Sequence, residues 1–88
     1  MLIRSQNKAL LVNLDNVASI CANNGNIIVD YVNRDHDSIA KYSTEEKALK
    51  VLDMIEAAVT RIWDCENKFV SVKGTDSLIF EMPPESEV

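Results

Sequence analysis

The fold is decided by residues 43–65, which read STEEKALKVLDMIEAAVTRIWDC. Ser43 is a candidate N-cap, and Glu46 three residues later completes a capping box. Glu45 and Glu46 also suit the positive end of a helix dipole. The sequence therefore predicts one long amphipathic helix over residues 44–65. Its buried face is predicted from apolar residues at helical spacing, namely Ala48, Leu49, Val51, Leu52, Ile55, Ala58, Val59, Ile62 and Trp63.

The segment before the helix has the pattern of a β-meander. Short apolar runs at residues 1–4 and 9–12, separated by polar residues, predict one hairpin. The runs at 17–22 and 27–32 flank Asn24-Gly25, which supplies the two positive-φ residues of a type I′ turn. A polar turn at 33–37 and a short strand at 38–42 complete the predicted meander.

The segment after the helix predicts a return to strand structure. Phe69, Val70 and Val72 suggest a short strand, residues 73–76 suggest a turn, and residues 77–82 suggest a final strand. Pro83-Pro84 ends that strand, because proline donates no ladder hydrogen bond. Residues 83–88 are predicted to be an acidic mobile tail.

Together these elements predict an α+β fold. We expect an antiparallel meander sheet of four to six strands, with the long helix packed on it and a final strand after the helix. Residues 1–82 then form a single α+β domain. One helix covers only one face of one sheet, and Ile28 and Val32, with Ile20 and Ile79, are candidates for the other face. Either the sheet curls into a barrel or a second copy covers that face, and apolar residues on both faces of the central strands favour a homo-oligomer.

Composition and charge narrow the classes of function. The net charge is −5 and the isoelectric point is about 4.7, which disfavours a phosphate backbone as a partner. The nine lysines and arginines are spread along the chain without a basic run. No apolar segment approaches the roughly 20 residues of a membrane span, and the first residues show no apolar signal core. We therefore expect a cytoplasmic protein.

The triplet Asp35-His36-Asp37 is the one place where catalysis suggests itself. A histidine between acids has the chemistry of a general base or a metal ligand. The chain has a single histidine, however, and the triplet falls in a predicted turn, where aspartates are common for backbone reasons. Asp15 and Asp30 have no calcium-loop spacing to these acids. A solvated turn is the favoured interpretation.

The two cysteines and the aromatic residues also fit structural roles better than chemical ones. Cys21 and Cys65 are far apart and have no neighbouring histidine, so reduced core or flank thiols are expected. Trp63 belongs to the predicted helix face, and the other aromatic residues are dispersed. No glycine-rich phosphate loop is present. We predict no catalytic, metal or cofactor-binding residue, and no cofactor.

Several short segments carry a family resemblance: residues 1–6, the Leu14-Asp15-Asn16 turn, residues 42–48 leading into 51–55, and the closing Phe80-Glu81-Met82-Pro83. On these segments the chain resembles a set of small uncharacterised phage and prophage proteins of Gram-positive bacteria. The resemblance covers most of the chain. It implies no reaction and no catalytic residues, and it implies a phage or mobile-element setting inside a bacterial host cell.

These observations predict a non-enzymatic protein–protein interaction module that self-associates and binds a host or phage protein. One alternative is an accessory nucleic-acid-associated module, which would need its basic side chains to converge on one face. The other alternative is a small hydrolase that uses His36.

Overall fold

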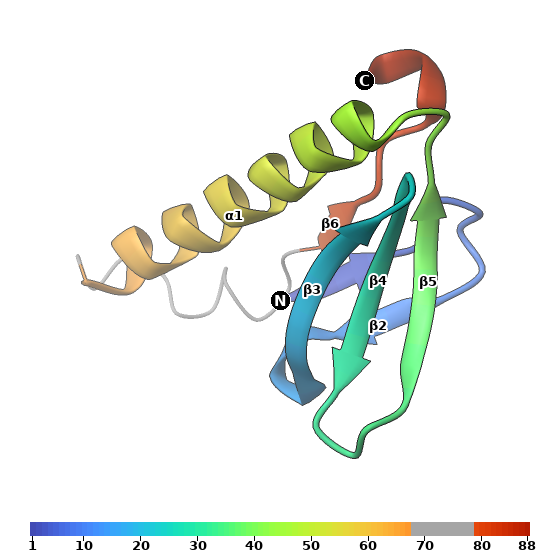
Figure 1. The fold of residues 1–88 in the computed structure, drawn as a ribbon. Helices are drawn as coiled ribbons and strands as arrows, with labels where there is room; N and C mark the ends of the chain where they lie inside the picture. Colours follow the sequence, from blue (N-terminus) through green and yellow to red (C-terminus); the bar gives the residue numbers. More distant parts are fainter. Residues whose placement is uncertain (68–78) are drawn as a thin grey trace.

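The computed structural model describes the backbone of residues 1–67 and 79–88 and the side chains of residues 1–59 and 79–88. The strand predicted at Phe69, Val70 and Val72, the turn at 73–76, and the side chains of Trp63 and Cys65 lie outside this part. The α+β class is confirmed: helix α1 covers Glu45–Asn67 and follows five strands (Figure 1). Within the described residues, no helix has the length and apolar character that crossing a membrane requires.

The strands form two small sheets and not the single meander that the sequence predicts. The first sheet has the order β2-β1-β6 and the second the order β3-β4-β5. Strand β6 pairs with β1 in parallel, so the chain ends meet in one sheet and the all-antiparallel expectation is wrong at this point. The bounds are Leu2–Arg4 for β1, Leu11–Asn13 for β2, Val17–Asn23 for β3, Asn26–Tyr31 for β4, His36–Lys41 for β5 and Ile79–Glu81 for β6.

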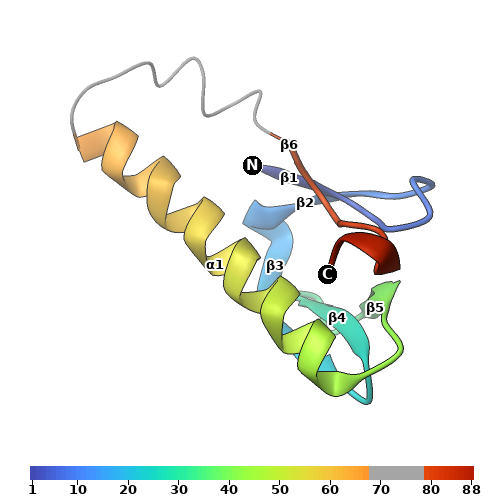
Figure 2. The same cartoon turned by 90° about the horizontal axis from the view of Figure 1, so that it is seen from above.

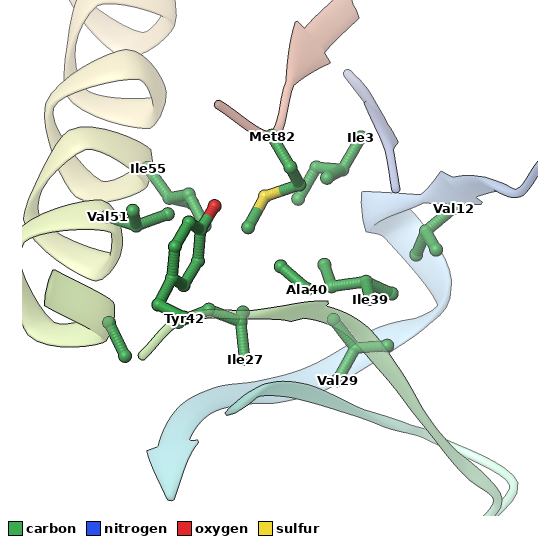
Figure 3. Packing of buried hydrophobic residues seen from close by; sticks show 11 residues of the cluster. Ile3, Val12, Ile27, Val29, Ile39, Ala40, Tyr42, Val51, Ile55 and Met82 are labelled. Atoms are coloured by element: carbon green, nitrogen blue, oxygen red, sulfur yellow. The ribbon is translucent and has the colours of Figure 1, made fainter. Parts of the chain in front are cut away.

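The core lies between the two sheets, with α1 along one side (Figure 2). Ile3 of β1, Ile27 and Val29 of β4, and Val51 of α1 are fully buried. Figure 3 shows Met82 and Ile3 approaching from the first sheet toward Tyr42 and Ile55. The first sheet therefore supplies the cover that a lone sheet with one helix would lack. The inner face of the second sheet is therefore covered, and Ile28, which stands between the buried Ile27 and Val29, lies on its outer face.

Both predicted hairpins in the first half are confirmed. Strands β1 and β2 pair antiparallel, and β3 and β4 pair around Asn24 and Gly25. These two residues have φ of 52° and 85°, as a type I′ turn requires. The turn also touches the start of α1, because the Gly25 N–H donates to Glu45 Oε1 at 3.0 Å. The Gly25 carbonyl accepts from the Tyr42 N–H at 2.8 Å.

An irregularity between Val17 and Ser19 changes which side chains of β3 face the core. Strict alternation puts Ala18, Ile20 and Ala22 on one face. In the structure Val17, Ile20 and Ala22 pack against the core, while Ala18 is exposed. An extra residue in one strand shifts which side chains face the core by one position. The simple in-out alternation assumed from the sequence cannot reveal such a shift. Ile20 is therefore a core-flanking residue and does not belong to an open sheet face.

The N-cap of the helix lies one residue later in the chain than the sequence predicts. Thr44 Oγ1 accepts from the Lys47 N–H at 3.1 Å, so Thr44 and not Ser43 caps the helix. Along the predicted apolar face, Ala48, Val51 and Ile55 are buried. Leu49 departs from the prediction with 49% of its surface exposed. The buried face of α1 is narrower than the apolar residues of the sequence predict, because only one side of the helix packs against the sheets.

Residues 83–88, for which the sequence predicts a mobile tail, make defined contacts with the start of α1. Glu85 Oε1 accepts from the Ser43 N–H at 2.7 Å, and Glu85 Oε2 accepts from Ser43 Oγ and from the Lys47 ammonium. The pKa of Glu85 lies below its ordinary value. The hydrogen bond from Lys47 is the largest cause, and the hydrogen bonds from Ser43 lower the pKa further. The Tyr42 hydroxyl donates to the Pro83 carbonyl at 2.7 Å in a buried position.

Candidate functional site

An open groove of about 790 Å³ lies at the end of the molecule that carries the β4–β5 turn. We call it the Asp37 groove. It is lined by residues 11–13 of β2, Asn16, residues 31–33, and residues 35–37. The structure therefore brings the Asp35-His36-Asp37 triplet into a concave surface. The triplet is not all turn, however, because β5 already begins at His36.

The groove combines apolar walls with exposed carboxylates. Leu11 and Val32 expose 46% and 67% of their surface, and the buried Val12 also lines the groove. Asp35 and Asp37 are exposed, and no lysine or arginine is among the lining residues. The groove is therefore acidic and partly apolar, which suits a cationic group attached to an apolar one.

One of these carboxylates is held in place by a phenol. The Tyr31 hydroxyl donates to Asp37 Oδ2 at 2.7 Å. Burial raises the pKa of Tyr31 to about 12, and the hydrogen bond and negative charge of Asp37 act in the same direction. Tyr31 therefore stays a neutral donor around neutral pH, and its hydroxyl fixes the position of the Asp37 carboxylate.

His36 lies in a cross-strand row that contains serine, aspartate and histidine but in an order unsuited to nucleophilic catalysis. Ser19 pairs with Asp30 across β3 and β4, and Asp30 pairs with His36 across β4 and β5. Ser19 Oγ donates to Asp30 Oδ2 at 3.0 Å. An activated serine must instead donate to the histidine, which the acid orients from behind. Strand register creates this row, so sequence spacing gave no signal for it.

The other candidate residues are not gathered into a chemical centre. The sequence predicts core or flank thiols, and Cys21 is exposed on β3, so it is not a core thiol. Among the described residues, no three His, Cys, Asp or Glu side chains lie close enough to hold a metal ion, so the candidate acids Asp15, Asp30, Asp35 and Asp37 do not form such a group. Their positions support surface roles.

Two basic side chains are already paired with carboxylates. Lys8 Nζ lies 3.3 Å from Glu81 Oε1, and Lys47 pairs with Glu85. These pairs lower the positive charge that a nucleic acid would meet at either place. The nucleic-acid alternative therefore gains no basic surface from Lys8 or Lys47.

No family model, curated protein or solved structure matches this chain. The Asp37 groove has to be interpreted from its own residues.

The two tyrosines of the chain give a direct test of the groove and tail contacts. The pKa values of Tyr31 and Tyr42 are both raised from 10.0 to about 12, chiefly by burial. We expect phenolate absorbance to appear near pH 10 in denaturant but only near pH 12 in the native protein. A raised folded pKa implies that the associated stability is present below pH 10 and is lost as the pH rises toward 12. Native titration of either phenol near pH 10 would contradict its burial.

Proposed function

We propose that this protein is a non-enzymatic protein–protein interaction module that self-associates, and that the Asp37 groove is its binding surface. The observation that carries the proposal is the exposure of Leu11 and Val32 beside the carboxylates of Asp35 and Asp37 in one groove. Large exposed apolar side chains within a concave, charged surface are typical of interaction sites.

The occupant that fits this surface is a protein segment with an apolar side chain next to a lysine or arginine. The apolar side chain would pack against Leu11 and Val32, and the cation would meet Asp35 and Asp37. The Tyr31 hydroxyl restricts the Asp37 carboxylate through Oδ2, which leaves Oδ1 for the cation.

The alternative of a hydrolase has less support. Ser19 donates a hydrogen bond to Asp30 and not to His36, so the row across the second sheet supplies no activated nucleophile. The resemblance to phage and prophage proteins implies a bacterial cytoplasm as the setting. We propose that the partner is a host or phage protein met there.

A displayed library of random short peptides tests the groove. We expect selection on the native protein to enrich peptides with a lysine or arginine within two positions of an apolar residue. We expect Leu11→Asp to weaken their binding by at least about tenfold, because it places a charge in the apolar wall.

Leu49→Asp is the matched control, because Leu49 is an equally exposed leucine that lies on α1. Both variants should keep the circular dichroism spectrum of the parent. If no peptide is enriched, or if the two aspartate variants bind the enriched peptides equally well, the groove is not the binding surface.

A further inference from the structure

The turn that borders the Asp37 groove presents the same chemistry that the groove accepts. Val32 in this turn exposes 67% of its surface. Arg34 follows two residues later and is exposed. Within the described residues Arg34 forms no ion pair, although acids stand at positions 35 and 37. An exposed apolar residue and an exposed cationic residue are therefore two positions apart in the turn that borders an acidic, apolar groove.

The backbone holds this turn in a defined shape. The Arg34 N–H donates to the Tyr31 carbonyl at 2.9 Å, and the Tyr31 N–H donates to the Asp35 carbonyl at 2.8 Å. Asn33 Oδ1 accepts from the Asp35 N–H at 3.0 Å. A turn already ordered in this way loses little entropy when it docks.

Arg34 stands in a conformation that its residue type disfavours. Its φ is +77°, where a side chain costs about 1–2 kcal/mol relative to the usual right-handed region. Glycine or asparagine would be the inexpensive choice for such a turn. Within the part of the chain that the structure describes, no ion pair of the Arg34 side chain offsets this cost, which points to a use outside the molecule.

We propose that the β4–β5 turn of one molecule docks in the Asp37 groove of a second copy, forming a two-fold dimer. This inference rests on the proposed function of the groove. Because turn and groove adjoin, a two-fold axis beside them makes both contacts at once. Arg34 of each copy meets Asp35 and Asp37 of the other, and Val32 of each packs near Leu11 of the other. The charged residues other than Arg34, Asp35 and Asp37 take no part in these two contacts.

Sedimentation velocity at rising protein concentration tests the dimer. We expect a reversible monomer–dimer equilibrium, weakened at least about tenfold by Arg34→Glu, by Val32→Asp, and by the double change Asp35→Lys with Asp37→Lys. Lys50→Glu makes the same charge change as Arg34→Glu on the exposed side of α1 and should leave the equilibrium unchanged.

Mixing gives the sharpest result. The Arg34→Glu variant and the double lysine variant each repel themselves, but a mixture restores attraction at both contacts, so we expect a heterodimer. Arg34→Gly separates dimerisation from folding, because it removes the cation and also the disfavoured φ. It should lower dimerisation while the melting temperature of the monomer stays equal or rises.

A native protein that stays monomeric up to millimolar concentration overturns the inference, as does a dimer insensitive to Arg34→Glu or a mixture that fails to associate. If the native protein is monomeric while library peptides still bind in the groove, the second copy is excluded as occupant and the self-association part of the proposed function fails, but the groove stands as the binding surface for another protein. If neither peptides nor a second copy bind, both proposals fail.

Discussion

Gly25→Ala is expected to lower the free energy of unfolding by about 3 kcal/mol. Gly25 has a φ of +85°, where any side chain is strained. A Cβ there would lie 2.4 Å from the Tyr42 carbonyl oxygen, which is a backbone atom and cannot rotate away. The substitution would push the β3–β4 turn off the segment that leads into α1.

The same turn also makes two hydrogen bonds, one to the first residue of α1 and one to the segment that precedes it. The Gly25 N–H reaches Glu45, and the Gly25 carbonyl accepts from the Tyr42 N–H. A displaced turn would weaken both hydrogen bonds, and this loss adds to the cost of the clash between the methyl group and the Tyr42 carbonyl. Denaturant unfolding followed by circular dichroism measures the loss, which for a domain this small corresponds to a fall in melting temperature of more than about 10 °C.

Asn24→Ala is the control for conformation alone. Asn24 also has positive φ, at 52°, but it already carries a Cβ without a clash. We expect it to cost about 1 kcal/mol. Equal losses for Asn24→Ala and Gly25→Ala would mean that the close approach to Tyr42 does not limit stability.

Met82→Ala is expected to cost about 3 kcal/mol, because it empties a buried position just after β6. Met82 is 5% exposed and packs in the cluster with Ile3, Tyr42 and Ile55, as Figure 3 shows. Its N–H donates to the Arg4 carbonyl at 3.1 Å, which extends the parallel pairing of β1 and β6. The cavity would therefore open between the first sheet and the helix.

Ile79→Ala separates this packing effect from a general loss of apolar surface on the same strand. Ile79 is 47% exposed, so its truncation should cost less than about 1 kcal/mol. Both variants can be compared by thermal and denaturant unfolding. A Met82→Ala variant as stable as Ile79→Ala would show that the chain after α1 contributes little to the core.

Local sequence signals predicted the elements whose causes are local. The helix followed from the spacing of apolar residues such as Val51 and Ile55, and the type I′ turn followed from Asn24-Gly25, because each depends on residues a few positions apart. The Asp35-His36-Asp37 triplet was also visible as a group. Its chemical character was not visible, since neither the hydrogen bond from Tyr31 to Asp37 nor the Ser19-Asp30-His36 row can be read without the strand register.

The sequence by itself determined an α+β chain with one amphipathic helix, two N-terminal hairpins and a strand after the helix. Only the tertiary structure decided that the strands divide into two sheets, that β6 lies parallel to β1, that Glu85 binds Ser43 and Lys47, and that Leu11 and Asp37 line one groove. The physical reason is that these contacts join residues far apart in the chain. Which of these contacts form depends on which apolar faces cover one another. The alternation of side chains within a single strand holds no information about which strand lies beside it.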